Sequence, residues 1–179
     1  MRNASIGRRV LVLGMAGAGK STFSRALSAK TGLPVIHLDV HYWKPRWVKP
    51  SETEWREKQR TLLADSAWIA DGNYHESLDL QLERADTVVI LETAWWLCAG
   101  RAFKRGLRKP EGELPPGCQD SRLRRLRDEW WIVGRVWRGR RSEPEQARAL
   151  VAEHGSHTAL HVLRSKEDVQ EFLDGLSGH

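Results

Sequence analysis

The chain has 179 residues, of which 40% are hydrophobic and 29% are charged. This balance excludes a disordered or fibrous protein and predicts a single globular domain over residues 1–179. The formal charge is +6, and the segment 95–141 alone holds 13 Lys and Arg against 5 Asp and Glu. We expect this basic segment to face an anionic partner: a triphosphate, a phosphorylated substrate or nucleic acid.

The two cysteines, Cys98 and Cys118, form no metal-binding or redox pair, so we expect reduced thiols in a cytoplasmic protein. The apolar run that follows the basic N-terminus is too short to cross a membrane and precedes a glycine-rich turn. It is more typical of a core strand than of a signal peptide. No membrane partner is expected.

Short apolar runs alternate with helical patterns along the chain. The runs that predict strands are residues 9–13, 34–39, 67–72, 87–91 and 158–163. The segments that predict helices are 21–30, 51–65, 77–84, 95–108, 121–138, 143–154 and a last helix capped by Ser165. A mobile loop is expected over 109–117, which is rich in Pro and Gly. The alternation predicts a three-layer α/β fold with a parallel sheet between helices.

Residues 14–21 match the phosphate-binding pattern G-x-x-x-x-G-K-[ST] in full, and they lie between a predicted strand and a predicted helix. Glycines allow backbone N–H groups to surround phosphates, Lys20 reaches the β- and γ-phosphates, and the Ser21 hydroxyl binds Mg²⁺. The N-terminus of the helix that follows adds partial positive charge, which favours phosphate binding. The segment therefore predicts binding of ATP and Mg²⁺. The predicted nucleotide-binding residues are Gly14, Met15, Ala16, Gly17, Ala18, Gly19, Lys20, Ser21 and Thr22.

Two acids end predicted strands, Asp39 in the second strand and Asp71 in the third. Ligands bind at the carboxyl edge of an open α/β sheet, so one acid is expected to hold Mg²⁺ and the other to orient or deprotonate an acceptor hydroxyl. We favour Asp71, with Ser21, for the metal and Asp39 for the acceptor. The alternative for either acid is a helix cap or a turn.

Arginines follow the fourth predicted strand. Arg101 and Arg105 are one helical turn apart, and four more stand at 122, 124, 125 and 127, beyond the Pro/Gly loop. We expect an inserted helical lid over about 101–141. Its closure would bring arginines, with Arg101 and Arg105 in catalytic roles beside Lys20, onto the phosphates and exclude water. The alternative is a solvated basic face.

Several of these segments resemble those of a known group of kinases. The phosphate loop, Asp39, the segment 68–72 and Arg101-x-x-x-Arg105 resemble the adenylate kinase and shikimate kinase group. The whole chain is similar to the bacterial topology modulation proteins, which are adenylate-kinase-like, through Tyr-Trp-Lys-Pro-Arg-Trp at 42–47 and Asp-Gly-Asn-Tyr at 71–74. The resemblance implies a five-stranded parallel sheet of nucleoside-monophosphate-kinase type, a lid, and transfer of the ATP γ-phosphate to a small-molecule or nucleotide-like acceptor.

The acceptor side departs from adenylate kinases, in which arginines after the second strand and after the Asp-Gly clamp a monophosphate. Here Asn73, Tyr74 and His75 follow the Asp-Gly pair, and Arg46 is the nearest arginine after Asp39. AMP is therefore not the expected acceptor. The acceptor-site candidates are Asp39, Tyr42, Trp43, Trp47 and Asn73. Trp43 and Trp47 would stack a base or a sugar face, and the alternative is that their loop packs onto the sheet.

The sequence also has features of two other classes of protein. A nucleotide-dependent regulator would bind nucleic acid through the basic segment and its tryptophans at 130, 131 and 137. The spacing of Leu123, Leu126, Trp130 and Val133 instead favours a buried helical stripe. A GTPase is not favoured because the sequence has no Asp-x-x-Gly. Histidines 37, 41 and 75 show no zinc spacing and are expected to be structural or to line the acceptor site.

Overall fold

Parallel strands form the centre of the computed structural model, which describes residues 6–107, 116–118 and 122–176, without the side chains of 105–107, 122–126 and 129. The strands are β1 (Arg9–Gly14), β2 (Val35–His37), β3 (Trp68–Asp71), β4 (Thr87–Leu91) and β5 (Ala159–Leu163). Their order in the sheet is β2-β3-β1-β4-β5, and every neighbouring pair is parallel. The predicted parallel sheet is confirmed.

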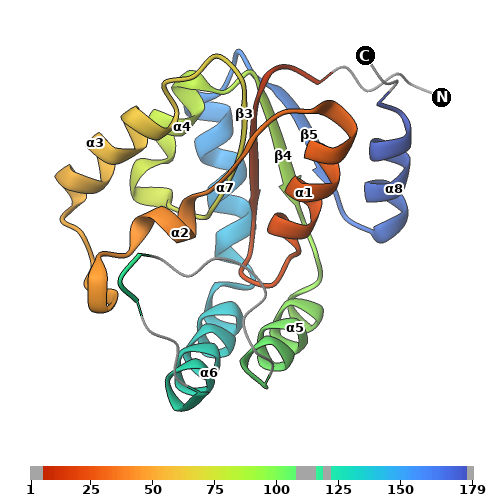
Figure 1. Cartoon of the computed structure of the whole chain (residues 1–179). Coiled ribbons are helices and arrows are strands. Elements are labelled where there is room, and N and C mark those ends of the chain that lie inside the picture. The colour runs from red at the N-terminus through yellow and green to blue at the C-terminus, as the bar shows by residue number, and fades with distance from the viewer. Residues whose placement is uncertain (1–5, 108–115, 119–121, 177–179) are drawn as a thin grey trace.

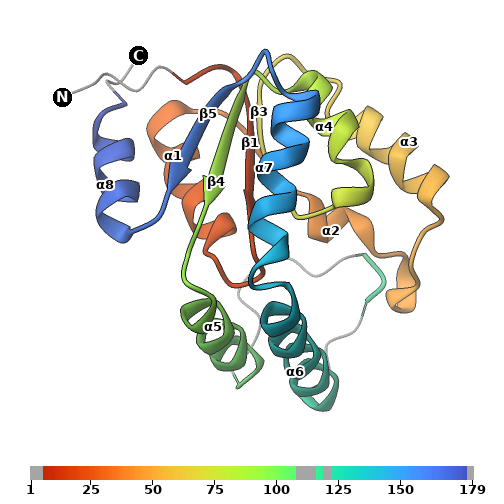
Figure 2. The ribbon, with the colours of Figure 1, turned by 180° about the vertical axis from the view of Figure 1, so that it is seen from behind.

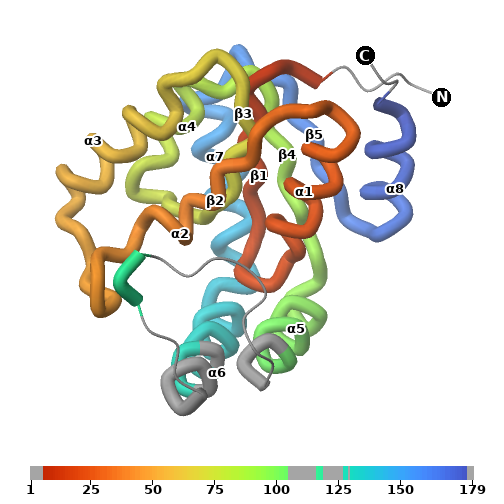
Figure 3. Tube along the Cα trace, viewed as in Figure 1, coloured from red at the N-terminus to blue at the C-terminus, as the bar shows by residue number. Residues whose placement is uncertain are grey.

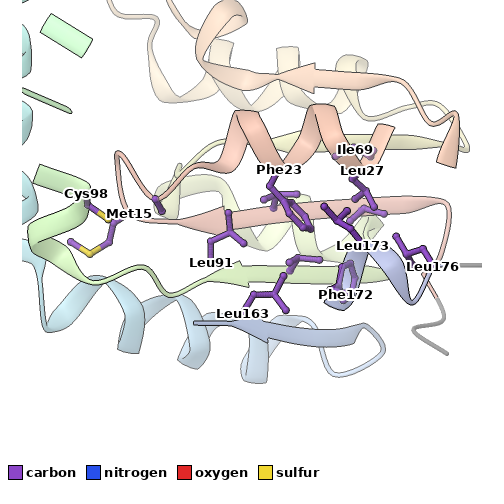
Figure 4. Close-up of a cluster of buried hydrophobic side chains, with 14 of the residues drawn as sticks. Met15, Phe23, Leu27, Ile69, Leu91, Cys98, Leu163, Phe172, Leu173 and Leu176 are labelled. Carbon is purple, nitrogen blue, oxygen red and sulfur yellow. The ribbon is translucent and has the colours of Figure 1, made fainter. Parts of the chain in front are cut away.

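Helices cover both faces of the sheet (Figures 1 and 2). One face carries α1 (Lys20–Thr31) and α8 (Lys166–Asp174), and the other carries α3 (Glu52–Leu62), α4 (Leu78–Arg84) and α7 (Ser142–His154). On the first face, Phe23, Leu27 and Phe172 pack against the strands (Figure 4). On the second, Trp68, Leu82 and Val151 belong to a separate buried cluster. The three-layer α/β architecture is confirmed.

The termini of two helices form as their sequences predict. Ser51 accepts a hydrogen bond from the Glu54 amide while the Glu54 carboxylate accepts one from the Ser51 amide, and Ser165 and Asp168 repeat this arrangement at α8. Such reciprocal caps satisfy amides that a helix start leaves without partners. The buried strands β3 and β4 have no exposed face, as expected for parallel strands between two helical layers.

The second predicted strand is shorter than its apolar pattern suggests. β2 ends at His37, and the chain turns at once into a short helix, α2 (Leu38–Tyr42), so Asp39 lies in a helical turn and not at a strand end (Figure 3). Leu38 is fully buried, and a Cβ at Gly72 would lie 2.9 Å from the Leu38 Cβ. The turn therefore forms because Leu38 packs on Gly72, the residue that directly follows β3. A 3₁₀ turn, η1 (Pro45–Trp47), follows.

The basic segment forms a helical hairpin of α5 (Trp95–Leu107) and α6 (Arg122–Gly139), which pack against each other beyond the carboxyl edge of the sheet (Figures 1 and 2). The loop expected over 109–117 lies outside the described residues, apart from 116 and 117. The arginine side chains at 105, 122, 124 and 125 also lie outside them.

The predicted buried stripe of α6 is wrong at Trp130, whereas Val133 is half-buried and the side chains of Leu123 and Leu126 lie outside the described residues. Trp130 is 69% exposed, whereas Val136 is 1% exposed and Ile132 packs against the main core cluster. Successive helical residues are rotated by about 100°, so a residue two positions from Ile132 points about 200° away from it. This helix therefore turns Ile132 and Val136 toward the core and leaves Trp130 toward solvent.

Candidate functional site

Residues 14–21, the P-loop, connect β1 to α1 at the carboxyl edge of the sheet. Gly17 and Gly19 have φ of +83° and +102°, in the left-handed region that favours glycine. A Cβ on Gly17 would stand 2.4 Å from the carbonyl oxygen of Cys98 in α5. Glycine is therefore required at position 17 both for the turn and for the close approach of α5.

Polar side chains hold the carbonyl groups of the P-loop. The Lys20 ammonium donates to the carbonyls of Gly14 (2.8 Å) and Met15 (3.2 Å). Arg101 donates to the carbonyls of Gly17 (3.3 Å) and Ala18 (3.2 Å). Arg101, one of the predicted catalytic arginines, thus lies against the P-loop. The side chain of its predicted partner, Arg105, is outside the described residues.

A polar chain runs from the P-loop across two strands. The Ser21 hydroxyl lies 3.5 Å from Oδ1 of Asp71, and Nδ1 of His37 lies 2.9 Å from Oδ2 of the same carboxylate. His37 and Asp71 are register partners in the β2–β3 ladder, which places their side chains together. The Asp71 side chain is 3% exposed. The hydrogen bond between His37 and Asp71 raises the pKa of His37 above the ordinary histidine value.

Ser21 and Asp71, the predicted metal ligands, therefore lie side by side. A hydroxyl and a carboxylate are the hard oxygen ligands that Mg²⁺ accepts, usually together with water and substrate phosphates. The described residues contain no group of three or more His, Cys, Asp and Glu placed to hold a metal ion by themselves. The residues present fit a magnesium ion that is held partly by the protein and partly by a nucleotide.

Asp39 lies in an aromatic setting. It is exposed, and its Oδ1 accepts a hydrogen bond of 2.7 Å from the Tyr74 hydroxyl. The Tyr74 ring lies 4.8 Å from that of Tyr42 and 4.9 Å from that of the buried Trp55. Burial, followed by the nearby Asp39 carboxylate, raises the pKa of Tyr74, so the phenol keeps its proton and donates a hydrogen bond to Asp39.

The predicted acceptor residues fall into two groups. Tyr42, Trp43 and Trp47 form a continuous ring cluster, with Tyr42–Trp43 centroids at 5.2 Å and Trp43–Trp47 centroids at 5.9 Å. The Asn73 side chain instead contacts α7, where its amide donates a hydrogen bond of 3.3 Å to the Glu143 carboxylate. The structure therefore brings Asp39 together with the aromatic candidates and places Asn73 in a different contact.

The loop that carries two of these candidates is strained. Arg46 and Trp47 have φ of +60° and +64°, conformations that cost non-glycine residues of order 1 kcal/mol each. The Arg46 amide donates to the carbonyl of Gly117 (3.1 Å), and the Cys118 thiol donates to the carbonyl of Lys44 (3.4 Å). A segment of the α5–α6 insertion thus contacts the aromatic loop.

A pocket of about 200 Å³ lies beside the P-loop, at the carboxyl ends of β1 and β4. Its lining includes Gly14 and Met15 of the P-loop, Asn73, Trp95, Arg140 and Glu143. Glu143, at the start of α7, has a side chain only 13% exposed and pairs with Arg135 of α6 at 3.4 Å.

Three residues of this region were not predicted from the sequence: Arg135, Arg140 and Glu143. His37 was expected to be structural or to line the acceptor site, and its pairing with Asp71 was not predicted. His37 carries a usable signal, because it lies at the carboxyl end of a predicted strand next to the one that carries Asp71. Arg135 and Arg140 lie in the last part of the insertion and Glu143 follows it, and no local pattern places the end of an insertion beside the P-loop.

Comparison with protein-family models and with curated proteins gives no match. Among solved structures, shikimate kinase from Acinetobacter baumannii in complex with shikimate is similar, with a TM-score of 0.52 at 16% identity over 94% of this chain and 89% of that one. Shikimate kinase from Bacteroides thetaiotaomicron gives 0.49 at 17% identity, over 94% and 95%. A sugar kinase from Janibacter sp. gives 0.47 at 16% identity, over 94% and 91%.

At these identities the likeness concerns the fold. The first of these structures is matched over nearly the whole of both chains, so the match includes the sheet, the helices on both faces and the P-loop edge. The chain therefore has the three-layer P-loop fold of the shikimate kinase type. As a separate finding, no helix in the described part of the chain is long and apolar enough to cross a membrane.

Proposed function

We propose that this protein is a phosphotransferase that moves the γ-phosphoryl group of ATP to a hydroxyl of a small acceptor. The observation that carries the proposal is the convergence of three groups at one edge of the sheet: the P-loop with Lys20, the Ser21–Asp71 pair, and Asp39 held by Tyr74. These are the donor, metal and acceptor elements that phosphoryl transfer needs.

On the donor side, the P-loop amides and Lys20 bind the β- and γ-phosphates of ATP. Lys20 lies over the carbonyls of Gly14 and Met15, which places its ammonium at the mouth of the loop. Ser21 and Asp71 would hold Mg²⁺, which when bound neutralises phosphate charge. Arg101 adds positive charge against the loop, and we propose the insertion 101–141, with Arg105, as a closing lid.

On the acceptor side, Asp39 orients the attacking hydroxyl and accepts its proton. The acceptor oxygen forms a bond to the γ-phosphorus, the bond from that phosphorus to the β–γ bridging oxygen breaks, and ADP leaves with the electron pair. The Tyr74 hydroxyl fixes one oxygen of the Asp39 carboxylate, which orients the group for this role.

The test is acceptor-dependent release of ADP from MgATP, measured with a panel of nucleosides, nucleotides, sugars and small hydroxylated compounds. Turnover that requires both an acceptor and Lys20 supports the proposal. The matched control is Lys30→Ala, at the far end of α1, where the side chain is about half exposed and pairs with Asp174. The absence of turnover with every acceptor class, despite tight MgATP binding, would refute phosphotransfer.

One observation favours a second candidate, a nucleotide-dependent protein that binds nucleic acid. Trp96, Trp130, Trp131 and Trp137 are each 51–69% exposed on the basic α5–α6 hairpin. Exposed aromatic rings on a basic surface suit stacking of unpaired bases. Fluorescence titration with single-stranded oligonucleotides at physiological salt separates the two: nucleotide-dependent binding without acceptor turnover favours this candidate.

A further inference from the structure

We propose that Gln59, a fully buried residue of α3, is a positioning residue for the proposed base Asp39. It acts through Ser77 and Tyr74, which link it to that carboxylate. The inference rests on the proposed phosphotransfer and deepens it, because it identifies the buried groups that set the orientation of the base. Three observations carry it: a chain of buried hydrogen bonds, the packing of the Tyr74 ring, and the contacts that bring Asp39 to the Tyr74 hydroxyl.

The chain of hydrogen bonds joins α3 and α4, which pack against each other (Figure 1), to the 3₁₀ turn η2 (His75–Ser77). Gln81 Nε2 donates to Gln59 Oε1 over 2.7 Å, and Gln59 Nε2 donates to the Ser77 hydroxyl over 2.6 Å. The Ser77 hydroxyl in turn donates to the carbonyl of Tyr74 over 3.4 Å. The two glutamines and the serine are each at most 1% exposed. The chain therefore runs from the protein interior to the backbone of Tyr74.

The direction of this chain is fixed by its last bond. A carbonyl oxygen can only accept, so the Ser77 proton points to Tyr74 and the Ser77 lone pairs are left for a donor. The amide nitrogen of Gln59 then faces Ser77, which leaves the Gln59 oxygen for Gln81. Buried polar groups are costly unless they are bonded, and a bonded chain holds its members in one arrangement. Gln59 therefore restricts where the Tyr74 carbonyl can lie.

The same face of α3 packs against the ring of Tyr74. Trp55 precedes Gln59 by one helical turn, so the two side chains share a face of the helix. The buried Trp55 ring lies 4.9 Å from the Tyr74 ring, measured between centroids. Gly72 also packs on this ring, since a Cβ at Gly72 would stand 3.1 Å from Cε2 of Tyr74. Tyr74 is thus held by its ring and, through Ser77, by its backbone.

Asp39 reaches this fixed tyrosine from α2. It is exposed, and its Oδ1 accepts a hydrogen bond of 2.7 Å from the Tyr74 hydroxyl. α3 contacts α2 as well, because Lys58 Nζ donates to the carbonyl of His41. An exposed side chain samples several rotamers unless a partner selects one. The Tyr74 hydroxyl is that partner for Asp39, and the position of the hydroxyl depends on Gln59.

Gln81 supplies a matched control for Gln59. Both are fully buried glutamines, and they share the 2.7 Å bond that joins α4 to α3. Of the two, Gln59 bonds the serine that contacts Tyr74, whereas Gln81 lies at the far end of the chain. A purely structural role for the chain predicts that activity follows stability in both variants. A positioning role predicts that the loss of activity belongs to Gln59.

The first measurement compares Gln59→Met with Gln81→Met in acceptor-dependent ADP release from MgATP, with thermal unfolding of both. Methionine is unbranched like glutamine and fills the space without the hydrogen bonds. We expect Gln59→Met to lower kcat by about tenfold or more, with KM for MgATP changed less than about twofold, because only the base is misplaced. Gln81→Met should lower kcat by less than about twofold. Equal losses of kcat would overturn the inference while leaving phosphotransfer intact.

Ser77→Ala gives the same test if Gln59→Met does not fold. It removes the hydroxyl that links Gln59 to Tyr74 and keeps the 3.1 Å bond from the amide of residue 77 to the Tyr74 carbonyl. The expected loss of kcat is again about tenfold with KM for MgATP unchanged. An unchanged kcat in Ser77→Ala would overturn the inference.

A double-mutant cycle shows whether Gln59 acts through the Tyr74 hydroxyl. Tyr74→Phe keeps the ring and removes the group that donates to Asp39, so it should lower kcat by itself. In that background Gln59→Met should lower kcat by less than about twofold further, because two residues on one route are not additive. Losses that multiply would mean that Gln59 acts by another route.

A readout without an acceptor separates this inference from phosphotransfer. The chain has two tyrosines, so exchange of the Tyr74 hydroxyl proton with water can be followed by NMR in tyrosine-labelled protein, with Tyr42→Phe to assign the signal. We expect this exchange to quicken by about tenfold or more in Gln59→Met and by less than about twofold in Gln81→Met. If no acceptor supports turnover, phosphotransfer fails, and the exchange rate still decides whether Gln59 positions Tyr74. An unchanged rate in Gln59→Met would overturn the inference.

Discussion

The imidazole of His37 and the carboxylate of Asp71 form a cross-strand pair, with Nδ1 and Oδ2 2.9 Å apart. The other Asp71 oxygen faces the Ser21 hydroxyl of the P-loop. The acid proposed for the metal is therefore fixed from both sides, by a neighbouring strand and by the first turn of α1. A carboxylate anchored in this way keeps its orientation before a ligand binds.

The His37–Asp71 pair predicts a pH-dependent stability in protein free of metal and nucleotide. The hydrogen bond to Asp71 raises the pKa of His37, with weaker opposing effects of burial and of Arg25. A raised folded-state pKa gives stability that is fully present below the unfolded value of about 6.5 and is lost as pH rises through the folded value.

Replacement of His37 by Gln should therefore lower the free energy of unfolding by about 1 kcal/mol at pH 6, and by less at pH 8.5. Urea unfolding of the parent and the variant at both pH values measures the difference. A deficit that grows with pH would contradict this account.

Lys20→Ala should abolish tight MgATP binding and leave the protein folded. The side chain bonds two carbonyls of the P-loop and is not part of the buried core, so its loss should cost about 1 kcal/mol of stability. Calorimetry with MgATP and thermal unfolding measure the two effects, with Lys30→Ala as the control. Unchanged ATP affinity would rule out the phosphate-binding role.

Asp39→Asn and Asp71→Asn should separate the acceptor from the metal. Loss of a general base costs about 10²–10⁴-fold in rate, so Asp39→Asn should reduce acceptor-dependent ADP release far more than MgATP affinity. Asp71→Asn should weaken the Mg²⁺ dependence of ATP binding itself. Titrations of Mg²⁺ against ATP affinity, with the exposed Asp65→Asn as control, distinguish them. Equal losses in both quantities for Asp39→Asn would count against its acceptor role.

Two tryptophan substitutions should differ sharply in their effect on stability. Trp130 is 69% exposed, so Trp130→Ala should change the free energy of unfolding by no more than about 0.5 kcal/mol. Trp68 is fully buried in β3, and Trp68→Ala should cost about 3–5 kcal/mol. Denaturant unfolding compares them. A large loss for Trp130→Ala would mean that the ring is buried in solution.

Much of the fold could be predicted because its signals are local. The buried strands are continuous apolar runs, Ser51 and Ser165 are followed by acids at capping distance, and the P-loop glycines stand where the backbone needs left-handed turns. The errors arose where a distant residue decides the local structure. β2 ends early because Leu38 packs on Gly72, and the exposed face of α6 follows from the burial of Ile132 and Val136.

The sequence by itself determined the proposed donor side, because a P-loop is one short continuous segment whose backbone and side chains act together. The tertiary structure decided how the proposed acceptor residues are placed: Asp39 of α2 meets Tyr74, which follows β3, and Asn73 meets Glu143 of α7. Residues so far apart in the chain meet because the parallel strands end at one common edge. No local pattern can encode that meeting, since it depends on the packing of the whole sheet.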